Sequence, residues 1–320
     1  MSRPIGFRDL LLLAVVVWGI PPWASAQEVR RLAPGVLKVI PSEPKDEESF
    51  QGPLPLNNIT RQVWDPPFEP KTYTLADMAS QVVLRRDIWN LEFAFKPLRL
   101  VQVDIPQLSG KMQQKLIWYM VYRVKNNGRH LRHVPKKDDF GHTTYDMVPT
   151  DEVLNYTAVR TAAIRFFPHF VFRSLDLNKE YLDRVIPVAI PVIQEREMRG
   201  AKLYNTVEIT KVEIPVSTAT NDQSVWGVVT WEDIDPQTKF FGIFVQGLTN
   251  AYRLGANSQG KIVHLQKTLQ LNFWRPGDTF NLRESEIRYG IPAYTDPTDS
   301  ARALAFYNLS VRVDHLWIYR

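Results

Sequence analysis

Apolar and polar residues alternate with a period of two along much of the chain after residue 91, and this spacing is typical of β-strands with unlike faces. The segment 115–128, KLIWYMVYRVKNNG, shows the pattern clearly, and its final Asn-Asn-Gly is typical of a turn. Arg123 and Lys125 fall on its polar face. The opposite face is predicted to be buried and consists of Leu116, Trp118, Met120, Tyr122 and Val124.

Two further segments alternate in the same way. In 163–172, AIRFFPHFVF, Pro168 removes a backbone donor, so we predict an edge strand or a bulged strand. In 261–274, KIVHLQKTLQLNFW, apolar residues alternate with polar ones. This segment is predicted to be a strand of an antiparallel sheet with one face in water.

The segment 225–248 has apolar residues on both faces of its two expected strands. VWGVV and KFFGIFVQGL flank the acidic stretch TWEDIDPQT, residues 230–238. Both faces of the strand pair must then be covered by other parts of the protein. The acidic stretch between them is predicted to be the turn of a hairpin, because Asp and Pro are ordinary turn residues.

Helical patterns are few. Thr74 and Asp77 resemble a capping box and predict a helix over 75–89. A second, short helix is predicted over 190–200, with Pro191 near its first turn and Gly200 as its stop.

These patterns predict a mainly β fold. Short strands between Gly and Pro turns favour two immunoglobulin-like antiparallel β-sandwich domains, 74–200 with the leading helix and 201–320. The preceding segment 27–73 is rich in proline, contains the acidic cluster EPKDEE and shows little periodicity. It is predicted to be an extended arm.

Residues 1–26 have the order of parts found in a secretory signal peptide. Arg3 and Arg8 precede an apolar run over 10–20, and Ala-Ser-Ala comes directly before Gln27. The alternative, a membrane anchor, is disfavoured because spanning a bilayer takes about 20 apolar residues. We therefore expect an exported protein, periplasmic or extracellular, without a transmembrane segment after cleavage.

The chain contains no cysteine, so an exported protein of this sequence must be held together by its core. This absence also favours a bacterial envelope. Removing residues 1–26, which carry two arginines and one aspartate, lowers the formal net charge from +5 to +4. Such a weak field identifies no ligand. Export disfavours nucleic acid as a partner, and no motif predicts a cofactor.

The acidic stretch is also a candidate site for a divalent cation. Three carboxylates stand within four positions, at Glu232, Asp233 and Asp235. The spacing departs from the calcium-loop pattern, because the required glycine is missing and Pro236 stiffens the segment. The turn is preferred to a metal site, and a general acid and base pair is the least favoured interpretation.

A second candidate is the segment 123–142, which contains a His-x-x-His pair of the kind that can bind a metal. Its histidines, His130, His133 and His142, accompany Asp138 and Asp139. The same segment carries four opposing cations, Arg129, Arg132, Lys136 and Lys137. A solvated basic loop is therefore preferred to a zinc site, and an acidic polymer or a phosphate head group is the ligand that suits it best.

The polar face of the strand at 262–272, which leads into WRPGD, is a third candidate. Amide side chains beside aromatic rings are typical of sugar-binding sheets, because hydroxyls need donors and acceptors and sugar rings stack on indole. The candidate ligand-binding residues are His264, Gln266, Gln270, Asn272 and Trp274. A plain wetted sheet face is the preferred alternative.

Several common enzyme motifs are missing from the sequence. It has no cysteine nucleophile, no Gly-x-Ser-x-Gly elbow, no His-Glu-x-x-His helix, no phosphate-binding glycine loop and no dinucleotide fingerprint. Their absence disfavours the corresponding enzyme classes.

Three stretches carry a resemblance to a known group of proteins. They are GVVTWEDIDPQTKFFGIFVQGLTNAYR, KTLQLNFWRPGD and EIRYGIP. With them the chain resembles a family of exported planctomycete-type proteins of unknown function, over most of its expected mature length. The resemblance implies no activity, substrate or site residue.

Taken together, the sequence predicts an exported, non-enzymatic structural or interaction protein of the cell envelope, whose partner is an envelope protein or a polysaccharide. One alternative is a carbohydrate-binding module that uses the 264–274 face. A weaker alternative is a divalent-cation-binding protein that uses the acidic stretch. The sequence predicts no oligomeric state.

Overall fold

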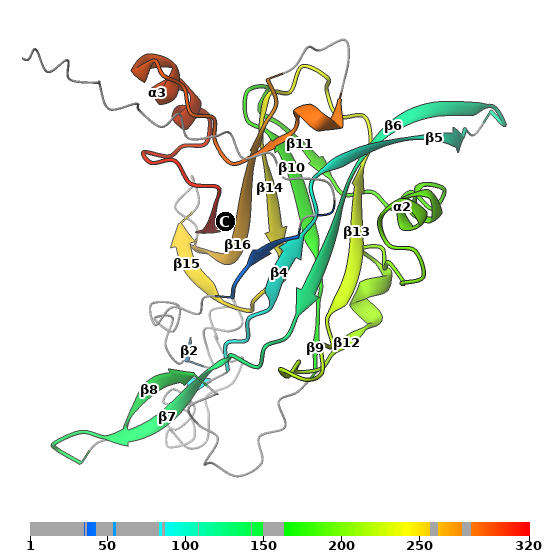
Figure 1. Cartoon of the computed structure of the whole chain (residues 1–320). Coiled ribbons are helices and arrows are strands. Elements are labelled where there is room, and N and C mark those ends of the chain that lie inside the picture. Colours follow the sequence, from blue (N-terminus) through cyan, green and yellow to red (C-terminus); the bar gives the residue numbers. More distant parts are fainter. Residues whose placement is uncertain are drawn as a thin grey trace, which may run out of the picture.

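The computed structural model of the chain describes residues 35, 37–42, 54–55, 83–84, 87–107, 109–141, 143–149, 163–256, 262–276 and 283–320. The expected signal peptide lies outside these residues, as does most of the expected arm. Strands predominate over helices among the described residues (Figure 1), which confirms the prediction of a mainly β fold.

The first sheet contains β1 (Lys38–Ile40), β4 (Glu92–Phe95), β5 (Arg99–Pro106), β6 (Met112–Lys125) and β13 (Val225–Trp231). All its pairs are antiparallel, in the order β1-β4-β6-β13. The long strand β6 pairs with β5 along its first part and with β4 along its second part. It is the strand predicted over 115–128. β1 comes from the expected arm, so part of that segment is a strand of the sheet rather than a free extension.

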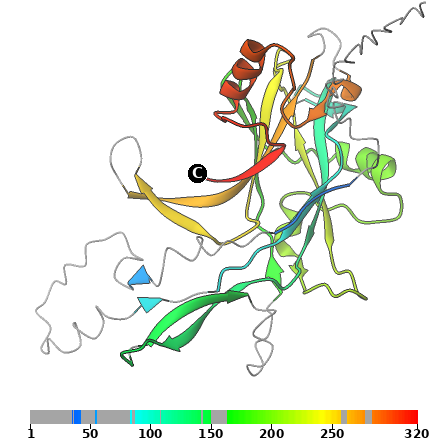
Figure 2. The same cartoon turned by 60° about the vertical axis from the view of Figure 1, so that its left-hand side comes forward.

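The second sheet contains β10 (His169–Ser174), β11 (Lys179–Leu182), β14 (Phe240–Gln246), β15 (Tyr252–Ala256), β16 (Ile262–Trp274), β17 (Arg288–Tyr289) and β18 (His315–Tyr319). Its order is β11-β10-β14-β16-β15, and β17 and β18 also pair with β16. β16 is the strand predicted over 261–274. Together with β15 it extends beyond the body of the sheet (Figure 2).

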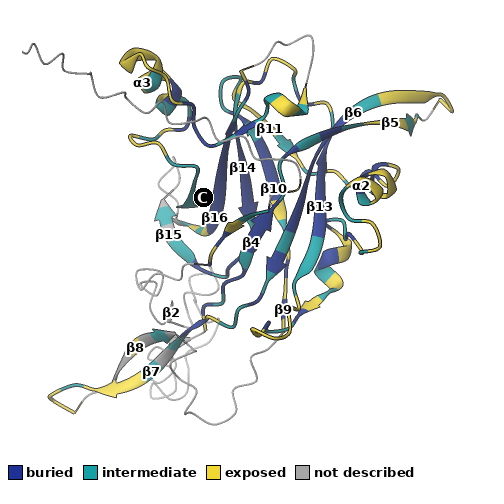
Figure 3. Cartoon of the chain, viewed as in Figure 1, coloured by how far each residue is buried: buried dark blue, intermediate teal, exposed yellow. Residues whose placement is uncertain are grey.

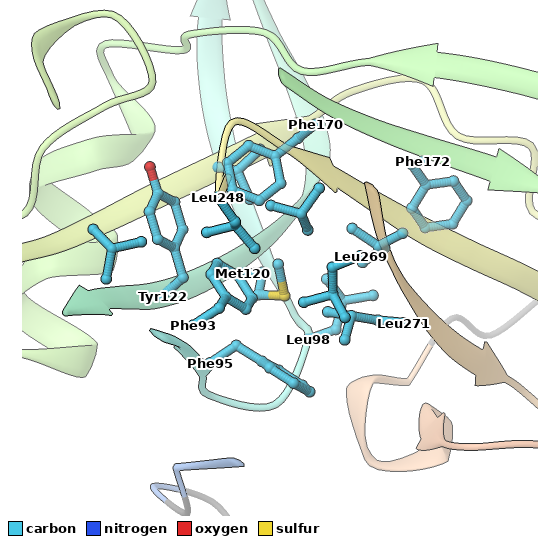
Figure 4. Packing of buried hydrophobic residues seen from close by; sticks show 14 of the residues in the cluster. Phe93, Phe95, Leu98, Met120, Tyr122, Phe170, Phe172, Leu248, Leu269 and Leu271 are labelled. Atoms are coloured by element: carbon cyan, nitrogen blue, oxygen red, sulfur yellow. The ribbon is translucent and has the colours of Figure 1, made fainter. Parts of the chain in front are cut away.

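The two sheets face each other across one hydrophobic core, which contains buried residues from both. Figure 4 shows Tyr122 of β6 beside Phe170 of β10, and their ring centroids are 5.0 Å apart. Phe172 and Phe241 stack at 4.6 Å, and Trp118 of β6 meets Phe241 edge-on at 5.8 Å. Burying each such side chain contributes roughly 1.5–3 kcal/mol, so a core of this size stabilises the fold without disulfides.

Each sheet contains strands that precede residue 200 in the chain and strands that follow it, although the sequence predicted a domain boundary near residue 200. β13 pairs with β6 in the first sheet, and β14 pairs with β10 in the second. The described residues therefore do not divide near residue 200 into two separate pairs of sheets. Alternation within a strand reports which face is buried, but it does not report which strand lies beside it.

β6 is buried on both faces, whereas the sequence predicted one buried face. Ile117, Tyr119 and Val121 form a second cluster on the side away from the main core. The helix α2 (Ala189–Glu197) covers them, with Ala189 and Ile193 in the same cluster. The helix matches the prediction over 190–200. It ends earlier than predicted, at Glu197 with Met198 as its C-cap, and Gly200, with a φ of +80°, lies in the turn that follows.

The predicted helix over 75–89 is wrong for its described part. Val83–Leu84 form β3, which pairs with β2 (Leu54–Pro55) from the expected arm. Further along, Ile88 makes an isolated bridge to Leu131. Pairing with distant segments outweighs the local helical signal here, as is common for short windows.

The segment around Pro168 also differs from its prediction. The chain breaks into β9 (Ile164–Arg165) and β10, with Pro168 in the gap between them. β10 is not an edge strand, because β11 and β14 pair with its two sides. The proline therefore ends one strand and lies outside the next.

Smaller elements complete the described structure. β9 pairs with β12 (Glu213–Ile214), and the short 3-10 helices are η3 (Glu208–Lys211) and η4 (Glu284–Glu286). The helix α3 (Pro297–Phe306) starts at Asp296, whose carboxylate accepts a bond from the Thr298 N–H at 2.7 Å. α3 packs on Phe240 through Phe306, with centroids 4.8 Å apart. Among the described residues, no helix combines the length and the apolar character needed to cross a membrane.

Candidate functional site

The acidic stretch 230–238 connects the two sheets and is not the turn of a hairpin. β13 before it belongs to the first sheet, and β14 after it belongs to the second. Asp233 adopts a φ of +57°, and the Thr238 N–H donates to the Asp235 carbonyl at 3.0 Å, so the stretch does contain tight turns. β14 lies between β10 and β16 in the second sheet, whereas β13 is the last strand in the order of the first sheet.

Each of the three acidic side chains of this connection contacts a cation. Lys115 Nζ lies 3.3 Å from Glu232 Oε2 and 2.8 Å from Asp233 Oδ2, and Arg184 also pairs with Glu232. The third pair is Lys179 with Asp235, at 2.6 Å. The Lys179 ammonium lowers the pKa of the Asp235 carboxyl, as does the Gln237 N–H. The cations favour a structural connection, because they occupy the oxygens that a metal would need.

No group of three or more His, Asp or Glu side chains that could hold a metal occurs among the described residues. The speculative cation site at Glu232, Asp233 and Asp235 is therefore a set of ion pairs in this structure.

The five candidate sugar-binding residues do not form one exposed face. His264 and Gln266 are exposed near the outer end of β16, and the His264 ring lies 5.0 Å from that of Tyr252. Gln270 and Asn272 are buried, and Trp274 is half-buried. The wetted face that the sequence predicted is thus limited to one part of the strand.

The two buried amides are bonded within the protein. Gln270 Nε2 donates to Asn272 Oδ1 at 2.8 Å, and Asn272 Nδ2 donates to the Val313 carbonyl at 2.9 Å. Their alternation with apolar residues resembled that of a solvated face, because periodicity does not distinguish water from a buried polar partner.

The basic segment contains the turn that follows β6 and then a β-hairpin. The hairpin consists of β7 (Leu131–Lys137) and β8 (Thr143–Pro149), which pair at seven positions. His130 lies buried at its base and His133 lies on β7, while His142 falls outside the described residues. Burial lowers the pKa of His130 below 6.5, so the ring is neutral at pH 7.

The β7–β8 hairpin extends away from both sheets in two views (Figures 1 and 2). Along the described residues of β7, burial changes from buried at the base to exposed at the outer end (Figure 3). Phe140 lies in the turn at that end and is 86% exposed, more than any other large apolar side chain that the structure describes. A protruding element therefore presents an aromatic ring to the surroundings of the protein.

The turn at the tip is held by its own hydrogen bonds. The Phe140 N–H donates to Asp138 Oδ1 at 3.0 Å, and the Gly141 N–H donates to the Asp138 carbonyl at 3.0 Å. Gly141 has a φ of +83°, which glycine adopts without strain. These bonds fix the backbone that carries the Phe140 side chain.

The base of the hairpin is anchored to the body. Ile88 and Leu131 exchange backbone bonds of 2.9 and 2.8 Å and share a small buried cluster with Ala251. Asp87 accepts from Arg132 Nε at 3.2 and 3.1 Å, and its carbonyl accepts from Asn250 Nδ2 at 2.9 Å. The hairpin therefore projects in a defined direction.

Phe140 is not among the candidate residues predicted from the sequence. A signal for it is present, since a single aromatic residue stands in KKDDFGH between charged residues and a turn glycine. An apolar residue in a turn has no core to enter, and such a residue is expected at the surface.

Comparison with known proteins assigns the chain to no family. No family model, no curated protein and no solved structure matches the chain.

Proposed function

We propose that the chain is an exported, non-enzymatic interaction protein of the cell envelope, and that it contacts a partner protein through the tip of the β7–β8 hairpin. The observation that carries the proposal is the 86% exposure of Phe140 on a hydrogen-bonded turn. Aromatic side chains are enriched among the residues that dominate binding energy at protein interfaces. A ring on a fixed backbone also loses little conformational freedom when it binds.

The charges on the hairpin favour a protein over a polyanion. Arg132 pairs with Asp87, and Lys136 pairs with Asp146 at 3.2 Å. Asp138 and Asp139 lie directly before Phe140 in the tip. A hairpin that carries carboxylates beside its cations does not concentrate phosphate or an acidic polymer, although the sequence alone suggested such ligands. A pocket with apolar walls and a polar rim fits this tip best.

The architecture and the expected export agree with this role. Two antiparallel sheets packed over a common core resemble the layered body of many cell-surface domains. We further propose that the two sheets form an immunoglobulin-like sandwich and that the protein is located outside the cytoplasm. Fractionation of the producing cells tests the location, and recovery of the protein with its first 26 residues intact in the cytoplasm would contradict it.

The interaction is tested with a photo-crosslinking phenylalanine analogue at position 140 in the producing cells. Phe167 is a matched control, because it is also exposed, at 61%, but lies outside the hairpin. We expect a discrete adduct with one protein from position 140 and none from position 167.

The partner identified in this way is then purified, and its affinity is measured for two variants. Phe140→Ala is expected to raise the dissociation constant about 30-fold, which corresponds to about 2 kcal/mol for a central aromatic contact. Phe167→Ala is expected to leave it unchanged, and the melting temperatures of both variants serve as a folding control. Equal adducts from both positions, or equal affinities, would contradict the proposal.

A further inference from the structure

A polar pocket of about 370 Å³ lies at the edge of the first sheet, and its lining residues fall outside β7 and β8. Its walls come from the end of β1, from β4, from the end of β6 with the turn that follows, and from residues 217–219. The volume is at the lower end of the range of roughly 300–1,000 Å³ for ligand pockets. It is suited to a ligand of the size of one sugar ring.

The walls of this pocket are fixed by a buried asparagine. Asn126 is fully buried, and its Nδ2 donates to the Ile214 carbonyl at 3.1 Å. The backbone carbonyl of Asn126 accepts from the Ser217 N–H at 2.8 Å, and its side-chain Oδ1 accepts from the Gly128 N–H at 3.0 Å. The pocket is therefore formed before any ligand binds, which lowers the entropy cost of binding.

The pocket contains both hydrogen-bond donors and acceptors. Glu92 accepts from Arg123 at 3.3 Å and from Asn127 Nδ2 at 3.0 Å. Because Asn127 donates through Nδ2, its side-chain Oδ1 can act as an acceptor for a ligand. The Ser217 hydroxyl oxygen accepts from the Gln223 N–H at 3.0 Å, so its proton can be donated to a ligand.

Charged side chains of both signs line the pocket. Lys125 and Arg129 line it together with Glu92. The nearest carboxylate that pairs with Lys125 is Asp222, at 3.8 Å, which is long for an ammonium with three donors. A doubly charged anion would be repelled by Glu92, whereas a single carboxylate can bind Lys125 while neutral hydroxyls bind Glu92 and Asn127.

We propose that this pocket binds a hexuronate, that is, a sugar ring with several hydroxyls and one carboxylate. The inference goes beyond the proposed protein interaction, because it uses a different surface and none of the hairpin residues. It places the carbohydrate recognition that the sequence suggested at a different site from the 264–274 face.

The test is calorimetric titration of the purified full chain with D-glucuronate, D-glucose and inorganic phosphate as separate probes. We expect saturable binding of D-glucuronate that weakens at high salt, and at least tenfold weaker binding of D-glucose and of phosphate. Binding of phosphate as tight as that of D-glucuronate would overturn the sugar assignment. No binding of D-glucuronate at millimolar concentration would overturn the site.

Two variants locate the binding in the pocket. Lys125→Gln removes the charge but keeps a polar side chain, and it is expected to weaken D-glucuronate binding at least tenfold. Lys136→Gln is the matched control, because Lys136 lies on the hairpin and is exposed, and it is expected to bind as the unchanged protein does.

Ser217→Ala provides a second test that does not depend on the folding of the Lys125 variant. It removes one hydroxyl from the pocket wall and is expected to weaken D-glucuronate binding several-fold. Unchanged affinity in both Lys125→Gln and Ser217→Ala would overturn the proposal. Because none of these measurements involves Phe140, they are independent of the test of the protein interaction.

Discussion

Gly227 lies directly opposite Tyr122 on neighbouring strands of the first sheet, and the Tyr122 ring occupies the space where a side chain at position 227 would be. A Cβ atom on Gly227 would come within 2.4 Å of Tyr122 Cζ. The glycine thus allows the ring to lie across the strand and enter the main core.

Gly227→Ala is expected to destabilise the protein by about 1–3 kcal/mol, because an added methyl group forces a buried ring from its place. The free energy of unfolding in urea measures this. Gly242→Ala is the control, since its Cβ would come no closer than 3.3 Å to a side-chain atom of Phe244, and we expect a smaller loss. Equal losses in the two variants would show that the Tyr122 ring is not the cause.

Glu197 links α2 to the first sheet through a buried carboxylate. It accepts from the Tyr119 hydroxyl at 2.9 Å and pairs with Arg99 at 3.0 Å and with Lys96 at 3.4 Å. Glu197→Gln removes the negative charge that Arg99 and Lys96 pair with, so we expect the free energy of unfolding to fall by about 2 kcal/mol. The neighbouring Glu195 is exposed, and Glu195→Gln should change stability by less than about 0.5 kcal/mol.

His130 makes the stability of the protein depend on pH. Burial lowers the pKa of its ring from 6.5, so below that pH the unfolded chain binds more protons than the folded chain. The stabilising effect of the neutral ring is complete above pH 6.5 and is lost as the pH falls through the lower folded pKa. The melting temperature should therefore fall between about pH 7.5 and pH 5.5, and His130→Gln should reduce this fall. An identical fall in the variant would assign it to other groups.

The acidic connection is expected not to bind calcium. Lys115, Arg184 and Lys179 already contact Glu232, Asp233 and Asp235. The weakest extracellular calcium modules have dissociation constants of about 1 mM. Calcium at a concentration several times higher should therefore leave the melting temperature of this protein unchanged. A rise that Asp233→Asn abolishes would contradict this expectation.

The candidate sites differ in how far the sequence could identify them. The carboxylates at 232–235 were visible, but their cations come from positions 115, 179 and 184, and no local pattern connects these segments. The pocket at the sheet edge was not predicted, because its polar groups come from four separate segments, around residues 42, 92, 125–129 and 217–219. Phe140 is the opposite case, since its exposure follows from a turn motif that can be read locally.

The sequence alone determined where strands form and which side chains share a face, as in β6 and β16, because alternation depends only on neighbouring residues. The tertiary structure decided which strands pair, which polar faces are covered and which charges meet. Gln270 and Asn272 follow the pattern of a wetted face, yet they are buried, since the C-terminal segment around Val313 packs against them. Burial and pairing come from contacts between distant segments, and their free energy has no counterpart in the local pattern.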